Sequence, residues 1–150
     1  MEECEFDASN LTLKFREVVP SRMDLAAAAI ERIMQVVHSM PCAQENLEEV
    51  ALALTEAISN AVIHGNHENP EKKVEICGAC EGHDKLVLIV TDEGEGFDPK
   101  DIPDPTIAEN VYAAHGRGIY LINHLMDQTE FRRGGRQVVL RKRVAGGNNR

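Results

Sequence analysis

Hydrophobic and polar residues alternate over residues 11–17, which predicts a half-buried strand with Leu11, Leu13 and Phe15 on one face. The spacing then lengthens. Over residues 23–38 the apolar residues recur every three or four positions, as on the buried face of an amphipathic helix. The chain is therefore expected to begin with a strand followed by a helix.

A second helix is predicted from about residue 44 to residue 64, and Gly65 is a natural place for it to end. Two apolar runs follow, residues 74–80 and residues 85–91, with a polar turn between them. They predict a hairpin. The second run is apolar on both faces, which is typical of a central, covered strand.

Residues 97–115 follow neither spacing and contain three prolines, so they predict a functional lid within the domain. Residues 118–127 predict a helix, and residues 136–143 a last strand. This order predicts an α+β fold, a two-layer sandwich with helices on one face of a mostly antiparallel sheet. The length of 150 residues suits a single domain spanning residues 1–150.

Composition narrows the function. There are 25 acidic and 16 basic residues, a net charge of -9, which argues against direct binding of nucleic acid through its phosphates. No apolar run approaches the roughly 18 residues of a membrane span. The start, MEECEF, has no secretory signal. We expect a cytoplasmic protein whose four cysteines stay reduced.

The second helix carries a polar stripe in apolar surroundings: Glu56, Asn60 and His64 lie four residues apart and share one face. An asparagine oxygen suits Mg²⁺, and a neighbouring glutamate suits a general base. The alternative is a hydrogen-bonded polar cluster in the core.

Two glycine-rich stretches add candidate binding loops. In DEGEGFDP (92–99), Asp92 follows the covered strand, and Gly94 and Gly96 permit close approach of another molecule. The alternative is a turn with a solvated aspartate. In AHGRGIYL (114–121), two glycines come immediately before the predicted helix, where free N–H groups favour phosphate. The alternative is a plain turn, and no Walker A loop is present because no Gly-Lys pair occurs.

Together, E-x-x-x-N-A-x-x-H-G, D-x-G-x-G-F and G-x-G-(I/L) resemble the N box and the two glycine boxes of the GHKL superfamily of ATPases and kinases. The resemblance covers residues 11–143 and implies the Bergerat fold with an ATP lid at about 97–115. GRGIYLINHLMD resembles the single-domain serine-kinase anti-sigma factors of bacterial partner-switching systems.

The resemblance implies a role for each motif. Asn60 would coordinate Mg²⁺, Glu56 would be the general base, and Asp92 would accept a hydrogen bond from the adenine amino group. Arg117 would contact the γ-phosphate. The nucleotide-binding residues it implies are Asn60, His64, Gly65, Asp92, Gly94, Gly96, Gly116, Arg117, Gly118 and Ile119.

The resemblance also implies a function. The cofactors would be ATP and Mg²⁺. The chain would be a serine/threonine protein kinase and an anti-sigma factor, with a sigma factor and a STAS-type antagonist as partners. It would form a homodimer through the first strand. The alternative is a catalytically silent module that controls a partner by nucleotide-dependent binding. One departure bears on affinity, because Arg136-Gln137 stands where many relatives carry a hydroxyl residue.

A zinc site is a further alternative. Cys77-x-x-Cys80 and His64-x-x-His67 provide four ligands of the right type. The two cysteines alternate faces along a predicted strand, however, and His64 belongs to the N box. A redox role for the cysteine pair is not favoured, because no βαβ pattern surrounds it.

Overall fold

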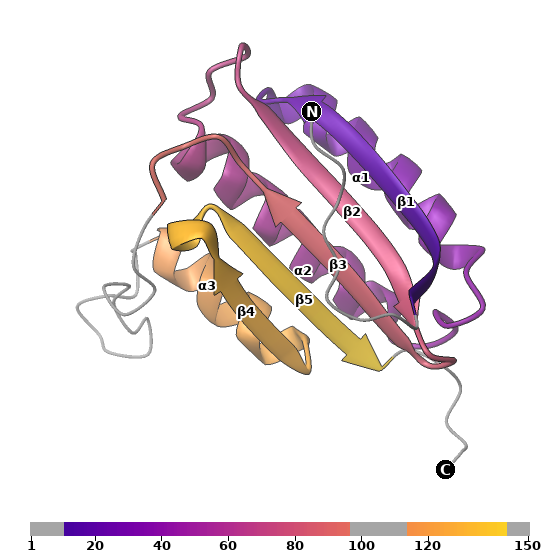
Figure 1. The fold of residues 1–150 in the computed structure, drawn as a ribbon. Coiled ribbons are helices and arrows are strands. Elements are labelled where there is room, and N and C mark those ends of the chain that lie inside the picture. Colours follow the sequence, from indigo (N-terminus) through magenta and orange to yellow (C-terminus); the bar gives the residue numbers. More distant parts are fainter. Residues whose placement is uncertain (1–10, 97–113, 144–150) are drawn as a thin grey trace.

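The computed structural model describes residues 11–96 and 114–143 (Figure 1). The described elements are β1 (Leu11–Pro20), α1 (Met23–His38), α2 (Leu47–Ser59), the π-helical segment η1 (Asn60–Gly65), β2 (Lys73–Glu81), β3 (Lys85–Thr91), α3 (Ala114–Leu125), β4 (Gln128–Arg132), a 3₁₀ turn (Arg133–Gly135) and β5 (Gln137–Arg143).

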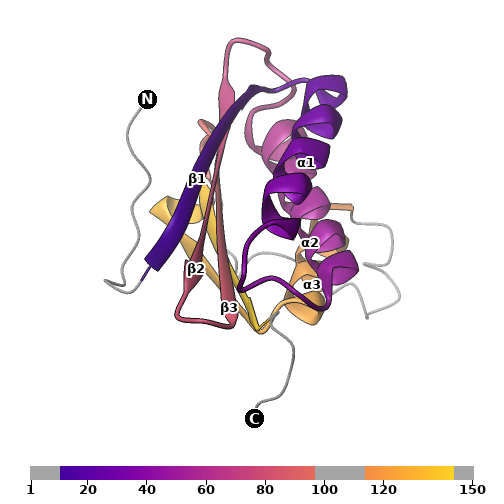
Figure 2. The ribbon, with the colours of Figure 1, turned by 90° about the vertical axis from the view of Figure 1, so that its right-hand side faces the viewer.

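The strands form one sheet in the order β1-β2-β3-β5-β4, and every neighbouring pair is antiparallel. The three helices lie side by side on one face of this sheet (Figure 2). The prediction of an α+β, two-layer fold is thus confirmed. No helix among the residues that the structure describes is long and apolar enough to cross a membrane.

β3 shows why the layers pack in this way. Leu86, Leu88 and Val90 point to the helices and join the main core, in which most side chains are almost fully buried. Val87 and Ile89, at the alternate positions, are buried on the other face. A strand with apolar side chains on both faces is shielded from water best at the centre of a sheet. β3 lies there, because it pairs with β2 on one edge and with β5 on the other.

Several helix and strand boundaries in the structure differ from the predicted ones. The bounds of α1 and β3 are confirmed, but β4 was not predicted at all. The second helix begins at Leu47 and passes into a π-helical turn at Asn60. The third helix begins at Ala114, so Gly116 and Gly118 lie inside its first turns, and residues 114 and 115 of the predicted lid belong to the helix. A helical glycine costs only about 1 kcal/mol relative to alanine, and packing can offset that amount.

The prediction of which side chains of β1 share a face is also corrected. The pairing of β1 with β2 shifts between Thr12 and Phe15, as at a β-bulge. An extra residue reverses the alternation of side chains beyond it. Leu11 therefore packs with the buried cluster on the face of the sheet away from the helices, whereas Phe15 packs with the core under the helices. They do not share one face.

The expectation that all cysteines stay reduced is wrong for Cys42 and Cys80, which form a disulfide with their Cα atoms 5.8 Å apart. The redox compartment expected from the sequence does not determine which cysteine side chains the fold brings together. Here the loop after α1 contacts the end of strand β2, and both cysteines are buried. Cys77 lies on the opposite face of the sheet, as its alternation with Cys80 predicted.

Candidate functional site

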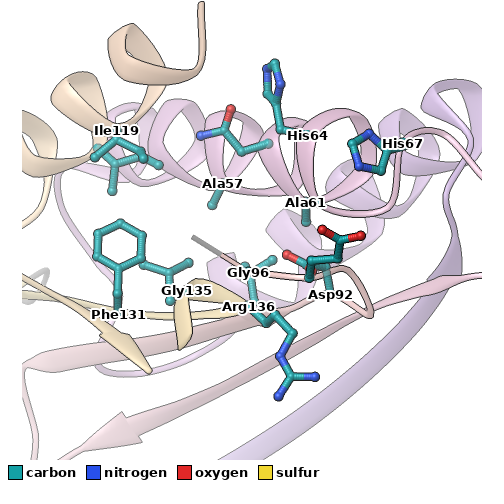
Figure 3. Close-up of a pocket in the computed structure, with 16 residues that line it drawn as sticks. Ala57, Ala61, His64, His67, Asp92, Gly96, Ile119, Phe131, Gly135 and Arg136 are labelled. Carbon is teal, nitrogen blue, oxygen red and sulfur yellow. The ribbon is translucent and has the colours of Figure 1, made fainter. Parts of the chain in front are cut away.

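A cavity of about 350 Å³ lies between the helix layer and the ends of the central strands (Figure 3). Its upper wall is the junction of α2 and η1, and its lower wall comes from β3, β4, β5 and their loops. The lining residues are Ala57, Asn60, Ala61, His64, Gly65, His67, Val90, Asp92, Glu95, Gly96, Ile119, Ile122, Phe131, Gly135, Arg136 and Val138.

The first polar group of the site is built where α2 meets α3. A Cβ added to Gly118 would lie 2.9 Å from Asn60 Nδ2, 3.2 Å from Asn60 Oδ1 and 3.2 Å from Glu56 Oε1. Glu56 and Asn60 are thus neighbours on one face of the helix, as their spacing predicted. Only glycine lets α3 pass so close to both side chains.

A change of helix type occurs at this group. Asn60 is the first residue of η1, whose π-helical turn is closed by the Asn66 N–H donating to the Ala61 carbonyl over 2.8 Å. Short π-helical turns inside α-helices are rare and frequently occur at functional sites. His64 also lines the cavity, with its ring directed away from Asp92 (Figure 3).

The second polar group is the carboxylate of Asp92, immediately after β3. Its Oδ1 accepts a hydrogen bond from the Gly94 N–H over 2.8 Å. Its own N–H donates to the Arg136 carbonyl over 2.9 Å. A Cβ on Gly65 would lie 2.5 Å from Asp92 Cγ, and one on Gly94 would lie 2.0 Å from the Gly65 carbonyl oxygen. The end of η1 and the Asp92 loop therefore fit together only through glycines.

Burial raises the pKa of Asp92 above its ordinary value of 3.8. The Gly94 N–H is the strongest opposing influence on this pKa, followed by the positive charges of Arg136 and Lys72. The apolar surroundings thus disfavour the ionised form, while one backbone donor and two cations favour it. The result is a partly buried acceptor facing the cavity.

The far rim carries the substituted Arg136-Gln137 pair. The side chain of Gln137 donates from Nε2 to Thr91 Oγ1 over 2.9 Å, beside Asp92. Arg136 donates from Nε to the Arg133 carbonyl over 3.1 Å, and its guanidinium is directed away from Asp92 (Figure 3). Where the resemblance led us to expect a small hydroxyl side chain, the chain therefore carries a long cation that turns outward.

Residues 19–142 match the histidine kinase-like ATPase domain. The chain belongs to this family. The matched range contains α2, η1, the Asp92 loop, α3 and nearly all of β5, so it includes every described wall of the cavity.

Relatives of this histidine kinase-like ATPase domain include the protein named serine-protein kinase RsbW in Bacillus cereus (strain Q1). It is 30% identical over 128 residues, which cover 78% of this chain and 76% of the relative. The protein of the same name in Oceanobacillus iheyensis is 29% identical over 119 residues, which cover 75% and 74%.

The structure places most residues predicted for the family's nucleotide site around one cavity. Asn60, His64, Gly65, Asp92, Gly96 and Ile119 line it. Gly94 and Gly118 pack directly behind this wall, and Glu56 adjoins Asn60. The surroundings of Gly116, the side chain of Arg117, and residues 97–113 of the predicted lid lie outside what the structure describes.

The sequence analysis missed the apolar walls of the site. Ala57 and Ala61 flank Asn60 on the helix, and Val90 shares its strand parity with Asp92, so these three could have been found by position alone. Phe131 lies on β4, whose five residues give too short a pattern to detect.

Zinc binding is not supported by the observed arrangement. The described residues contain no group of three or more histidine, cysteine, aspartate or glutamate side chains able to hold a metal ion. Cys77 and Cys80 occupy opposite faces of β2. Asn60 Oδ1 and Glu56 Oε1 do provide two oxygen atoms on one side of Gly118, a donor type that suits Mg²⁺ shared with phosphates.

Proposed function

We propose that the chain is an ATP-dependent serine/threonine protein kinase and an anti-sigma factor. The observation that carries the proposal is the pairing of Glu56 with Asn60 beside Gly118, at a cavity whose other polar end is Asp92. One end of the cavity offers a base and a metal ligand, and the other offers an acceptor for a nucleobase. The relatives named serine-protein kinase support the same activity.

The base-binding end follows from the lining. The Asp92 carboxylate would accept a hydrogen bond from the adenine amino group, and such charge-assisted bonds are among the stronger ones. Val90, Ile119 and Phe131 supply apolar surface for the faces of the ring. Guanine carries an oxygen where adenine carries the amino group, so the carboxylate would discriminate against GTP.

The phosphate-binding end would transfer the terminal phosphoryl group. Asn60 would hold Mg²⁺, which neutralises phosphate charge when bound, and the free N–H groups in the first turn of α3 would bind phosphate oxygens. Glu56 would accept the proton of the partner's serine hydroxyl as that oxygen bonds to the γ-phosphorus. The bond to the β–γ bridging oxygen breaks, and ADP leaves.

We propose a sigma factor and its STAS-type antagonist as the protein partners. The motif GRGIYLINHLMD and the relatives' name support this choice. A sigma-factor client would place the chain in the cytoplasm, where transcription takes place in bacteria. We also propose a homodimer, because β1 is an edge strand and among the described strands it pairs only with β2.

The silent-module alternative is favoured by one observation. Glu56 does not line the cavity itself but lies beside Asn60. A module that binds ATP only to control a partner would need Asp92 and Asn60 but not a base. The two functions therefore differ in what Glu56 does.

Two variants test the proposal in an assay of radiolabelled phosphate transfer to a co-purified antagonist. Glu56→Gln keeps the size of the side chain and removes its basicity, so ATP affinity should stay near that of the native chain. Transfer should fall by roughly 10²- to 10⁴-fold. Asn60→Ala should instead weaken Mg²⁺–ATP binding, because Mg²⁺ requires near-ideal ligand geometry.

The results of these assays distinguish the kinase from the silent module. A native chain that binds ATP but transfers phosphate to no partner would support the silent module. Equal loss of binding in both variants would show that Glu56 is structural. Equal affinity of the native chain for ATP and GTP would overturn the role of Asp92.

A further inference from the structure

Asn66 immediately follows η1 and is a buried polar residue with three side-chain hydrogen bonds. It is 1% exposed. Its Nδ2 donates to Ser21 Oγ over 2.8 Å and to the Lys73 carbonyl over 3.0 Å. Its Oδ1 accepts from the Glu93 N–H over 2.8 Å. Both amide protons and one carbonyl lone pair are therefore used.

These bonds join Asn66 to three other segments, two of them distant in sequence. Ser21 follows β1 and Lys73 begins β2, so the two Nδ2 bonds anchor Asn66 to one end of the sheet. Glu93 follows Asp92, so the Oδ1 bond holds the backbone beside the carboxylate. The backbone N–H of Asn66 closes the π-helical turn that begins at Asn60. Asn66 is thus hydrogen-bonded both to the π-helical turn at the proposed phosphate end of the cavity and to the Asp92 loop at the proposed base end.

The Asp92 loop is held from two sides. On one side the Asp92 N–H donates to the Arg136 carbonyl. On the other, Asn66 receives the Glu93 N–H, and Glu93 in turn accepts from the Lys73 N–H at Oε1 over 2.6 Å. Removing the Asn66 side chain leaves the Glu93 N–H without its acceptor in a part-buried place, and this unfavourable state is relieved by movement of the loop.

We propose that Asn66 is the positioning residue for base selection: it fixes the Asp92 carboxylate at a set distance from Asn60, so that adenine and the triphosphate are bound together. The proposal rests on the nucleotide-binding function proposed above. Asn66 itself is hydrogen-bonded to protein groups and does not face the nucleotide. Its effect is on discrimination between bases rather than on phosphate binding.

Discrimination is measured as the ratio of ITP to ATP dissociation constants. Inosine triphosphate keeps the triphosphate but carries a carbonyl oxygen and an N1–H where adenine carries the amino group and an unprotonated N1, so the ratio reports the contacts at this edge of the base. A hydrogen bond to a charged group contributes about 1.5–3 kcal/mol, equivalent to a ratio on the order of 10- to 100-fold in the native chain. Asn66→Ala should reduce it to about threefold or less, with binding of Mg²⁺–tripolyphosphate nearly unchanged.

Two control variants separate positioning from general support of the fold. Ser21→Ala removes one anchor of Asn66 and the hydroxyl's own bond to the Lys72 carbonyl, but leaves the bond to Glu93. It should lower thermal stability and keep the nucleotide ratio. Asn69→Ala removes only the exposed acceptor of the Glu71 N–H and should change neither. All ratios are measured well below the unfolding midpoint of each variant.

Asn66→Asp keeps an acceptor for the Glu93 N–H and loses the amide donors. Measured at pH 8, it should retain the native ratio within about threefold, and it decides the question if Asn66→Ala does not fold. Loss of the ratio in Asn66→Asp, or its survival in Asn66→Ala, would overturn this inference alone. A native chain that does not distinguish ATP from ITP would overturn the base-binding role of Asp92 and this inference with it.

Discussion

At the scale of single residues, Asp92 is where folding and binding make opposite demands. Its apolar surroundings raise its pKa above 3.8, so the ionised form is disfavoured in the chain without nucleotide. The proposed contact with adenine requires the same ionised form as an acceptor. Because the folded-state pKa is raised, this carboxyl contributes stability that is full below pH 3.8 and is lost as pH rises through the folded-state pKa.

Asp92→Asn should therefore move stability and affinity in opposite directions. At neutral pH the nucleotide-free variant should be at least as stable to urea as the native chain, since an amide carries no charge to bury. Its affinity for ATP should fall by about 10- to 100-fold, the value of a hydrogen bond to a charged group. Urea unfolding and calorimetry with ATP measure the two effects.

The pH dependence provides the control. As pH falls toward the raised pKa of Asp92, the native chain should lose ATP affinity that Asp92→Asn does not lose, because only the native side chain becomes protonated. The variant keeps the pH dependence of the triphosphate itself. Parallel pH profiles for the two proteins would contradict an ionised Asp92 at the base.

At the scale of elements, the contact of α2 with α3 builds the phosphate end of the site. Gly118 presents bare backbone to Glu56 and Asn60, and a Cβ there would lie 2.9 Å from the Asn60 amide. Alanine is favoured over glycine in a helix by roughly 1 kcal/mol. Helix stability and site geometry therefore favour different residues at this position.

Gly118→Ala should leave overall stability nearly unchanged, because the gain in helix propensity offsets the displaced side chains. Phosphate transfer should fall by about 10²-fold, the usual effect of misplacing catalytic groups by about 1 Å. Asn123→Ala, at an exposed position of the same helix, is the matched control and should keep native activity. Native transfer in Gly118→Ala would show that the close contact is not needed.

The Cys42–Cys80 disulfide joins the loop before α2 to the end of β2 across 38 residues of sequence. Closing a loop of this length stabilises the fold by about 4 kcal/mol through the unfolded chain. The oxidised native chain should therefore have a higher urea midpoint than a variant with Cys42→Ser and Cys80→Ser. ATP affinity should be similar, because α2 is about 20 Å long and Asn60 follows its far end.

Equal urea midpoints for the two proteins would contradict a stabilising bond. Alkylation of thiols in the native cell, before lysis, measures whether the bond is present there. A bond found reduced in the cell would agree with the cytoplasmic location proposed above.

At the scale of the whole molecule, the helices that the structure describes cover one face of the sheet (Figure 2). The second apolar cluster, Cys77, Val87, Ile89 and Val139, lies on the other face, with Leu11 of β1 packed against it. β1 is also an edge of the sheet, and a strand edge readily pairs with another chain. The edge position of β1 among the described strands supports pairing of two copies through this strand.

We expect a homodimer by light scattering at micromolar concentration with nucleotide present. Each copy carries a net charge of -9, so repulsion opposes association and added salt should strengthen the dimer by screening it. A monomer at every salt concentration would contradict the prediction.

The sequence by itself determined the elements whose spacing repeats over many residues, and the motifs that lie within one element. α1 was predicted with its observed bounds because sixteen residues keep one helical period. Glu56 and Asn60 were predicted as neighbours because they are four apart on one helix. Asp92 was predicted to follow the covered strand directly because the apolar run ends there. All these relations depend on backbone periodicity alone.

Only the tertiary structure decided the features that depend on contacts between distant segments. β4 has five residues and is a strand because β5 pairs with it. The shift in β1 reverses Leu11 relative to Phe15 through pairing with β2. The Cys42–Cys80 bond joins segments that no local pattern connects, and the hydrogen bonds of Asn66 reach Ser21 and Glu93. A periodicity describes how one segment meets its surroundings, whereas these contacts depend on which other segment packs there.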